Sequence, residues 1–357
     1  MSPIPEFLQS GPDPKGIAEN SRGLSTATPP DHNPPHPSTP KGVPESWSRF
    51  QSHITATLSL LAATFLCLIG CTADSKSIVV YTSQDQIYAE PIFAAFTAST
   101  GIRVLPVFDN EAVKTVGLVN RLIAEKDNPQ CDLFWNNEEL RTRMLAVKGL
   151  FAQSNGWRSA GLRSRRIVVN QNLVPPDNRP HSFLELTNVI WKGRVALSYP
   201  LFGTTATHFM ALRQKLGDQP WQDWCNALAA NKPFLVDGNS MVVKMVGRGE
   251  ALVGMTDSDD IYAGKADGLP IEAVAFSDDG LMIANTIATI RNAPHAALAS
   301  QLRDFLQQPR ILKQLQETGA LETSASPASS AGLQPDWPSL VADIEPITEQ
   351  LKRIFLR

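Results

Sequence analysis

The feature that most constrains the fold of this chain is a repeated order of strand, polar loop and helix. A short β-branched run at residues 77–81 (SIVVY) breaks into polar residues at 82–85. Helical spacing follows over residues 90–99, and residues 101–107 (GIRVLPV) predict a second strand. Chains that alternate in this way form α/β sheets, which bind ligands beyond the carboxyl ends of their strands. The polar residues at the first such end, which we expect to contact a ligand, are Ser83, Gln84 and Asp85.

A third predicted strand, residues 131–135 (CDLFW), also ends in polar side chains. An amphipathic pattern over residues 113–125 predicts the helix before it. Trp135 closes the strand, where an aromatic ring either fills the core or stacks on a ligand, and the apolar run favours the core. The polar residues that follow, expected at the same edge of the sheet as the first group, are Asn136, Asn137 and Glu138.

An acidic run at residues 254–260 (GMTDSDD) follows the apolar segment 251–253. Carboxylates this close repel one another, so the site must supply solvent, hydrogen-bond donors or a cation. The alternative is an acidic surface turn that caps the next helix. We interpret the run as one wall of a ligand site, with Thr256, Asp257 and Asp259 as contacts. Because cleft carboxylates are not core, a variant in which both aspartates become alanine is expected to lose the ligand and keep the fold.

A helix start after a further predicted strand suits an anion. The strand covers residues 195–200 (VALSYP), and the helix begins at residues 203–206 (GTTA). The first backbone N–H groups of a helix have no partner within it, and the hydroxyls of Thr204 and Thr205 add donors. Ordinary helix capping by these threonines is the alternative. The sequence therefore predicts an anion site at this turn.

The composition describes a globular protein with more than one core. A chain of 357 residues exceeds one ordinary domain and suits two lobes. Its hydrophobic fraction is 43%, its charged fraction is 19% and its formal net charge is -3, so nucleic acid is not an expected partner. The sequence has no glycine-rich phosphate loop, no Cys-x-x-Cys pair and no nucleophile elbow. We therefore expect a binding protein and not an enzyme.

The N-terminal region differs in composition from the rest. Residues 1–53 are rich in proline, and we expect them to be disordered. The apolar run and LIGC segment at residues 54–71 resemble a bacterial lipoprotein signal, in which the thiol of Cys71 becomes lipidated after cleavage. An uncleaved anchor is the alternative, and both place the chain outside the cytoplasm. Of the later cysteines, Cys131 and Cys225, we expect two separate buried thiols.

Together these segments resemble a known family. In order they read YTSQD, TGIRVLPVFDNEAVKTVGLVNRLIAEKDNPQCDLFWNNE, YPLFGTTATH, VDGNS and GEALVGMTDSDD. This order is similar to the extracellular solute-binding proteins of bacterial ABC importers, in the ferric-iron-binding branch of the type II periplasmic-binding fold. The resemblance implies a two-lobed α/β fold with a hinge and an interlobe cleft.

The resemblance also implies a division of the chain and a role. Residues 77–170 would form the first part of lobe one, with residues 166–170 as the first crossing strand, and residues 171–272 would form lobe two. Residues 273–357 would return to lobe one, on which the C-terminal helices would pack. The protein would be a monomeric, lipid-anchored receptor, periplasmic or on the cell surface, that delivers a small solute to an ABC permease and its ATPase.

The metal ligands of this family are only partly matched. Ferric binders of this branch hold the metal with two adjacent tyrosines, a histidine and a glutamate. Here the tyrosine pair reads Ser258 and Asp259, the histidine position reads Asp85, and the glutamate position reads Asn137 with Glu138 beside it. Carboxylate oxygens suit hard cations. The oxygen ligands that remain for such a cation are Asp85, Glu138, Asp257 and Asp259.

The anion site of the family is better matched. In ferric binders a synergistic anion lies at the turn that matches Thr204 and Thr205, and Asn239 with Ser240 matches another part of that site. The resemblance thus implies ferric iron or another hard cation as cargo, with no resident cofactor. The alternative cargo is a phosphonate or sugar phosphate, because an anion site that faces acidic and amide groups also suits such solutes.

Overall fold

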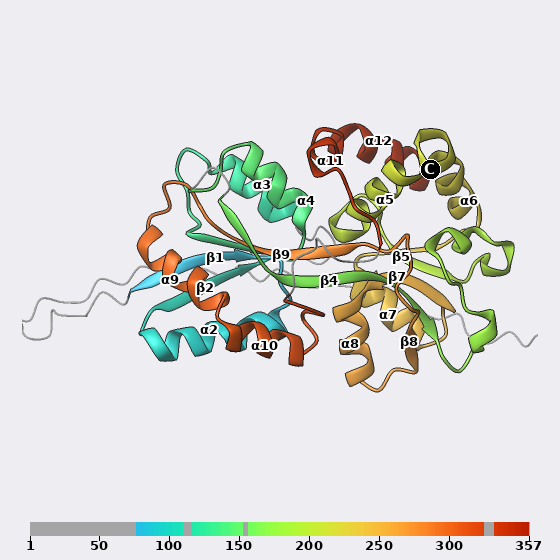
Figure 1. Ribbon diagram of the computed structural model, residues 1–357, viewed down its shortest axis with the longest axis horizontal. Coiled ribbons are helices and arrows are strands. Elements are labelled where there is room, and N and C mark those ends of the chain that lie inside the picture. Colours follow the sequence, from blue (N-terminus) through green and yellow to red (C-terminus); the bar gives the residue numbers. More distant parts are fainter. Residues whose placement is uncertain (1–75, 110–115, 153–155, 325–331, 357) are drawn as a thin grey trace, which may run out of the picture. The chain divides into compact units, whose positions relative to one another are not determined.

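The computed structural model describes one compact unit of the chain, which lies within Thr72–Arg357 (Figure 1). Three sequence predictions lie outside the described residues: the disordered extension at 1–53, the lipoprotein signal at 54–71 and lipidation of Cys71. No helix of the described part is both long and apolar enough to cross a membrane. The residues that the structure describes are 76–109, 116–152, 156–324 and 332–356.

Strands and helices alternate along most of this unit, as the sequence predicts. The elements up to the first long strand are β1 (Ser77–Thr82), α2 (Gln86–Thr100), β2 (Arg103–Phe108), α3 (Val116–Ala124), β3 (Leu133–Asn136), α4 (Glu139–Val147) and β4 (Trp157–Asn170). Short 3₁₀ helices follow at Pro176–Asn178, Phe183–Thr187 and Val189–Trp191. The next elements are β5 (Val195–Ser198), α5 (Gly203–Leu216), α6 (Asp218–Ala230), β6 (Phe234–Val236), α7 (Asn239–Gly247), β7 (Val253–Asp257), α8 (Ser258–Ala266) and β8 (Ile271–Ala273). The last are β9 (Met282–Thr289), α9 (Ala296–Leu306), α10 (Pro309–Glu317), α11 (Trp337–Ala342) and α12 (Ile344–Phe355).

Local sequence explains where the first helix begins and ends. α2 starts directly after Asp85 and stops at Gly101, whose φ of 71° is left-handed and whose N–H bonds the carbonyl of Thr97 at 2.9 Å. Glycine reaches this conformation without steric cost, so it ends helices readily. The helix buries Ile92 and Phe96 against the sheet. The predicted helix at 90–99 is therefore correct, although it begins four residues earlier than its apolar spacing indicates.

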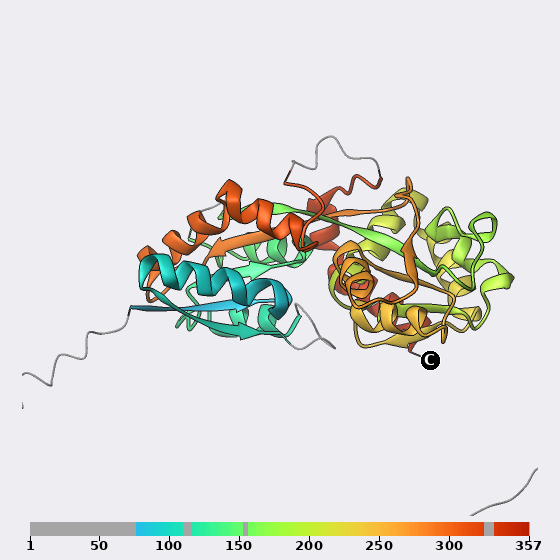
Figure 2. The same ribbon diagram turned by 90° about the horizontal axis from the view of Figure 1, so that it is seen from below.

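The described strands form one nine-stranded sheet in the order β2-β1-β3-β9-β4-β7-β5-β6, with β8 paired to β4. β1 pairs in parallel with β2 and β3, whereas β5 pairs in parallel with β6 and β7. Figures 1 and 2 show β4 and β9 passing between these two groups of strands. The result is the two-lobed α/β fold that the sequence predicts.

The crossing strand is longer than predicted. β4 pairs antiparallel with β9 as far as Ser164, and with β7 from Arg165 onward. The strand therefore changes lobe at Ser164 and Arg165, and it begins at Trp157, well before the predicted segment 166–170. The sequence did not indicate the full length of β4, because the charged residues 163–166 (RSRR) interrupt the apolar pattern of the strand. The lobe boundaries 77–170, 171–272 and 273–357 stay a prediction.

The cores confirm two predictions about buried residues, those for Trp135 and for the two cysteines. Trp135 is fully buried and packs edge-on against Phe93, with ring centroids 5.7 Å apart. Cys131 and Cys225 are buried free thiols, and burial raises the pKa of both. Trp221 is buried in α6, where it belongs to the largest core cluster.

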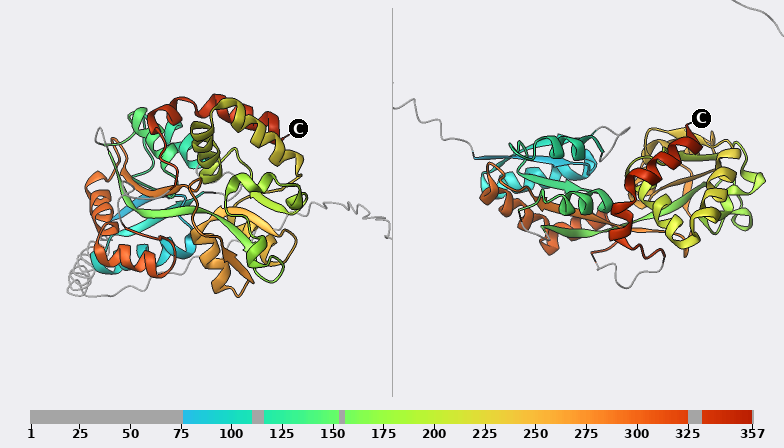
Figure 3. Two further views of the ribbon diagram at one scale, coloured as in Figure 1. Left: turned by 45° about the vertical axis from the view of Figure 1, so that its right-hand side comes forward. Right: turned by 90° about the horizontal axis from the view of Figure 1, so that it is seen from above.

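The C-terminal helices correct one prediction. α9 packs on β9, β1 and β3, and Figure 2 shows α2 beside α9 and α10. α11 packs on α4, but α12 packs on α5 and α6, as both views of Figure 3 show. The ring of Phe355 lies edge-on to Phe209 of α5, with centroids 5.8 Å apart. The chain therefore ends on lobe two, and not on lobe one as expected.

Candidate functional site

A pocket of about 40 Å³ lies where strands end and helices begin. Asn137, which follows β3, lines it from lobe one, and Arg163 lines it from the crossing strand β4. Lobe two supplies the ends of β5, β6 and β7 and the first residues of α5, α7 and α8. This is the edge at which α/β sheets bind ligands. The polar residues of lobe two that line the pocket include Ser198, Thr204, Thr205, Asn239, Asp257 and Asp260.

The predicted anion residues lie together on one wall of this pocket. Thr204 Oγ1 donates to Asp257 Oδ2 at 2.8 Å, and Thr205 Oγ1 lies 2.5 Å from Ser198 Oγ. Asn239 Nδ2 donates to Asp257 Oδ2 at 3.0 Å, and Asn239 Oδ1 accepts from Ser198 Oγ at 3.0 Å. The two threonines therefore join a side-chain network and do not cap the helix that they begin.

Two helices begin at this wall without a side-chain cap. The N-cap residue is Phe202 for α5 and Gly238 for α7, and neither accepts a capping hydrogen bond through its side chain within the described structure. The first N–H groups of a helix carry partial positive charge and have no partner within the helix. Two such starts beside one pocket are suited to an anion. Anion binding at Thr204, Thr205 and Asn239 stays a prediction.

Two further predicted ligand residues, Thr256 and Ser240, lie next to the pocket without lining it. Thr256 is buried, and its Oγ1 donates to the backbone carbonyl of Asn239 at 3.1 Å, so it supports the position of Asn239. Ser240 lies in the first turn of α7, next to Asn239 and outside the residues that line the pocket.

Two buried arginines, which the sequence analysis missed, pair with the acidic run. Arg165 Nη1 lies 2.7 Å from Asp257 Oδ1, and the two residues are direct cross-strand partners on β4 and β7. Arg163 Nη2 lies 3.0 Å from Asp257 Oδ2, and Arg163 Nη1 pairs with Asp259 Oδ2. The side chains of Arg165, Asp257 and Asp259 are 0% exposed and that of Arg163 is 4% exposed. The acidic run is therefore a charge-paired network, and not a solvated surface turn.

The sequence contains a pattern that could have identified these two arginines as buried and paired. Successive side chains of a strand point to opposite faces, so Arg163 and Arg165 share one face of β4. Two charges on the same face of a strand between apolar residues need buried partners. The acidic run at the end of another strand supplies them.

Four carboxylates surround Arg163. Burial alone would lower its pKa, but the charges of Asp259, Asp257, Asp260 and Asp85, in that order, raise it above the usual value. Likewise burial would raise the pKa of Asp257, but Arg163 and Arg165 hold it below its usual value. These four carboxylates and the guanidiniums of Arg163 and Arg165 give a formal net charge of about -2 around Arg163, which favours a cation nearby.

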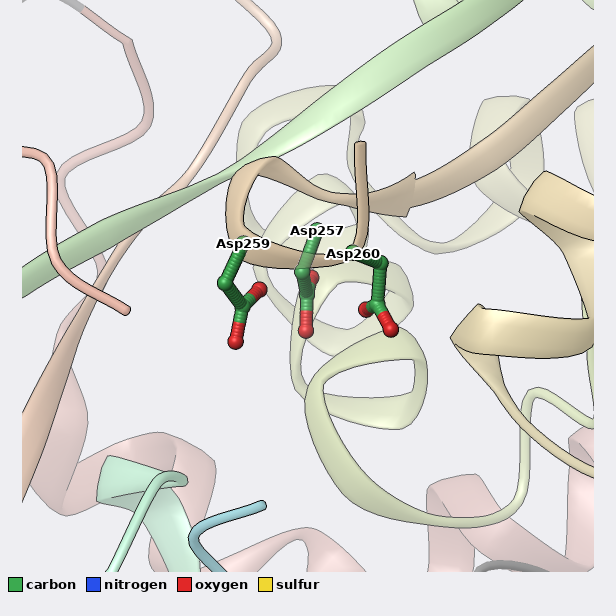
Figure 4. Close-up of side chains that lie close together, drawn as sticks. All are labelled: Asp257, Asp259 and Asp260. Atoms are coloured by element: carbon green, nitrogen blue, oxygen red, sulfur yellow. The ribbon is translucent and has the colours of Figure 1, made fainter. Parts of the chain in front are cut away.

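The carboxylates of Asp257, Asp259 and Asp260 lie side by side (Figure 4). One oxygen from each lies within 4.8 Å of the others, which is close enough to share one metal ion. Among the described residues, neither Asp85 nor Glu138 belongs to this group. Asp260 therefore replaces them in the set of carboxylates that the structure brings together.

Glu138 has a structural role that the sequence analysis did not foresee. It is buried and caps α4, because its Oε1 accepts from Leu140 N at 2.6 Å and its Oε2 accepts from Arg141 N at 2.8 Å. Thr207 of α5 donates to Oε1 at 2.7 Å, so the carboxylate also ties the two lobes together. Burial raises the pKa of Glu138. The carboxylate of Glu138 does not belong to the converging group of the described residues, and it caps α4 instead.

The predicted residues of lobe one form a network of their own. Ser83 Oγ lies 2.5 Å from Asn136 Oδ1 and 2.9 Å from Asn137 Oδ1, and Gln84 Oε1 accepts from Asn285 Nδ2 at 3.1 Å. Ser83, Gln84 and Asp85 line a separate hollow of about 200 Å³. Asn137 belongs to this network and also lines the pocket of lobe two, so it connects the two groups of predicted residues.

A tyrosine from lobe one approaches the acidic run. Tyr88 of α2 is buried, and its hydroxyl donates to the backbone carbonyl of Asp259 at 3.4 Å. Burial, and then the charges of Asp259, Asp85 and Asp260, raises its pKa. Its phenol stays neutral in this setting, and the sequence alone gave no reason to place it near the site.

A buried histidine lies behind the pocket. His208 of α5 is fully buried, and its Nε2 lies 2.7 Å from the backbone carbonyl oxygen of Asp279. Burial, and after it the positive charge of Arg165, lowers the pKa of its imidazole from 6.5 to about 4. The ring is therefore neutral at ordinary pH and donates through Nε2.

Comparison with known proteins gives one family match and several structural neighbours. The model of the family described as bacterial extracellular solute-binding protein matches residues 78–320. The Fe(3+)-binding periplasmic protein of Serratia marcescens is 27% identical over 216 residues, which are 56% of this chain and 62% of that protein. The match thus spans less than two thirds of that relative.

Two solved structures share the fold. Iron-bound HitA from Pseudomonas aeruginosa has a TM-score of 0.69 at 19% identity, over 77% of this chain and 99% of that one. AfuA from Actinobacillus pleuropneumoniae, solved with fructose-6-phosphate, has a TM-score of 0.64 at 17% identity, over 79% of this chain and 97% of that one. At such identities the likeness extends to the fold and not to the ligand.

Proposed function

The chain belongs to the bacterial extracellular solute-binding proteins, and we propose that it captures ferric iron or another hard cation and delivers it to an ABC permease. The family consists of binding proteins and not of enzymes. Its place would be outside the cytoplasm, anchored to the membrane by a lipid on Cys71. Iron would be cargo and not a resident cofactor. The iron-binding relative from Serratia marcescens supports this choice of cargo.

One observation carries the proposal. The carboxylates of Asp257, Asp259 and Asp260 converge on one another, Asp257 and Asp260 line the pocket, and the three outnumber the guanidiniums beside them. Carboxylate oxygens are preferred by ferric iron and other hard cations. The helix starts at Thr204 and Asn239 would hold a synergistic anion next to the metal.

Lobe closure would complete the site. Asn137 and Asp85 come from lobe one, whereas the acidic run comes from lobe two, so only a closed form lets both touch one cargo. Ligand would therefore shift an equilibrium between open and closed forms, and the permease would recognise the closed form.

The experiment compares cargo classes on one preparation. Chelator-treated protein is titrated with ferric iron, with and without phosphate, and the shift in thermal unfolding is recorded. We expect stabilisation of about 2.7 kcal/mol at a hundredfold excess over Kd, and tighter binding when phosphate is present. Asp260→Asn should weaken the effect, whereas Asp267→Asn, at the exposed end of α8, should not. No stabilisation by any hard cation would contradict the proposal.

A second candidate cargo is a phosphonate or sugar phosphate. The observation in its favour is the pair of helix starts without side-chain caps, whose first residues Thr204 and Asn239 line the pocket. Fructose 6-phosphate and an aminoalkylphosphonate serve as probes in the same assay. Stabilisation by either that survives a chelator would favour this candidate over iron.

A further inference from the structure

Arg163 occupies the position that a metal ion would take among the oxygens of the site. Its Nη2 lies 3.0 Å from Asp257 Oδ2 and donates to the backbone carbonyl of Asn137 at 3.1 Å, and its Nη1 pairs with Asp259. Two carboxylates and one carbonyl thus converge on this guanidinium from both lobes. Oxygens of these kinds are also the ligands of hard cations.

The guanidinium of Arg163 is buried within the site and does not lie on its surface. Its side chain is 4% exposed, it lines the pocket, and its Nε has no hydrogen-bond partner in the described part of the chain. Arginine does not lose its proton in proteins, so this positive charge is permanent. A second cation placed between Asp257 and Asp259 would meet that charge within a few ångströms and in a poorly screened place.

We propose that Arg163 is a resident counter-cation, which competes with a metal ion for Asp257 and Asp259 and so lowers the affinity of the site for bare cations. A metal ion would bind these carboxylates only as the guanidinium withdraws from them. The inference deepens the proposed function and rests on it for the nature of the cargo.

Arg165 does not share this role. It is 0% exposed and does not line the pocket, and its hydrogen-bond partners within the described residues, Asp257, Thr204 and Asn239, all belong to lobe two. Arg163 is the residue of the pair that also contacts lobe one, through Asn137. Displacement of Arg163 would therefore affect both the charge of the pocket and the contact between the lobes.

The test uses Tb³⁺ as the probe, because it prefers oxygen ligands and its luminescence is sensitised by a nearby tyrosine such as Tyr88. Arg163→Met keeps an unbranched, flexible side chain and removes the charge. We expect this variant to bind Tb³⁺ at least about tenfold more tightly than the unaltered protein, and to gain more thermal stability from it. Arg163→Lys keeps the charge and should bind Tb³⁺ about as weakly as the unaltered protein.

Two further variants keep the test decisive. Arg166→Met removes a neighbouring arginine of β4 that pairs with Glu322, and should leave Tb³⁺ binding unchanged. Arg163→Met with Asp259→Asn removes one charge of each sign, so it should fold without metal and bind Tb³⁺ less tightly than Arg163→Met alone. Equal or weaker Tb³⁺ binding by folded Arg163→Met overturns the inference. An Arg163→Met protein that is unfolded and does not refold in saturating Tb³⁺ overturns it as well.

The outcome is separable from that of the proposed function. If the unaltered protein binds no ferric iron but Arg163→Met gains Tb³⁺ affinity, the cargo is wrong and the role of Arg163 stands. If the protein binds ferric iron and Arg163→Met gains no Tb³⁺ affinity, the proposed cargo stands and the role of Arg163 is wrong.

Discussion

At the scale of single residues, the site depends on charges that are buried and paired. Asp257 receives hydrogen bonds or ion pairs from Arg163, Arg165, Thr204 and Asn239. Taking a charge out of water is costly unless partners replace the lost hydration. These carboxylates therefore belong to the stability of lobe two as well as to its ligand site.

The double variant Asp257→Ala, Asp259→Ala was expected to keep its fold because cleft carboxylates are not core, and that premise is wrong, since both side chains are 0% exposed. Removing both carboxylates leaves Arg163 and Arg165 buried without their counter-charges. Breaking a buried ion pair costs about 3–5 kcal/mol, so we expect at least that loss in the free energy of unfolding. Urea denaturation measures it, with Asp267→Ala as the exposed control. A change below about 1 kcal/mol would show that the network contributes little.

His208 should make stability depend on pH. The unfolded chain takes up a proton near pH 6.5, whereas the folded imidazole does so only near pH 4. Between these values the unfolded state binds more protons, so stability is complete above pH 6.5 and falls as the pH drops. The expected loss is about 1.4 kcal/mol per pH unit, or about 3 kcal/mol by pH 4.

Denaturation curves at several pH values test this contribution. His208→Gln keeps a donor for the Asp279 carbonyl but does not titrate, so its stability should fall less steeply across this range. The lowered pKa of Asp257 affects a different range, because the stability it contributes is lost only as the pH falls below about 4. Equal slopes for the two proteins would contradict a neutral buried imidazole.

At the scale of elements, the strand ends and helix starts could be predicted, but the partners of the last helix could not. The strand-to-helix turns at Asp85, Thr204 and Asp257 follow from apolar runs that stop at polar clusters. Amphipathic spacing identifies the apolar face of α12, but it does not say which lobe that face meets. Arg163 was missed for a related reason, because its partners are distant in sequence.

α12 gives a test of this placement. Phe355 packs on Phe209 of α5, so Phe355→Ala should destabilise the protein by about 3 kcal/mol through lost burial and a residual cavity. Hydrogen exchange should speed up in α5 and α6 and stay unchanged in α9. Leu356→Ala is the matched control, because that neighbouring side chain is 46% exposed. Faster exchange in α9 instead would place the helix on lobe one.

At the scale of the whole described unit, few polar contacts join the lobes. Thr207 of α5 donates to Glu138, Tyr88 donates to the carbonyl of Asp259, Tyr262 of α8 donates to the carbonyl of Glu317, and Arg163 reaches Asn137. An arrangement of the lobes that depends on so few polar bonds is easily shifted by a ligand, because each bond is worth about 1 kcal/mol.

Thr207→Val should therefore favour the open form. The change removes the hydroxyl that donates to Glu138 and keeps the shape of the side chain. A loss of about 1 kcal/mol shifts the equilibrium roughly fivefold, and small-angle scattering should record a larger radius of gyration without ligand. Thr187→Val, whose hydroxyl donates to the nearby carbonyl of Leu184, is the control. An unchanged radius would mean that this bond does not hold the lobes.

β4 bends just before it changes lobe. Its pairing with β9 shifts register between Ser159 and Leu162, and Gly161 there has a φ of 110° that other residues rarely adopt. Two residues farther along, the same strand carries Arg163. Rotation of one lobe about this irregular stretch of β4 would also move the guanidinium of Arg163. Lobe opening and the positive charge within the pocket would therefore change together.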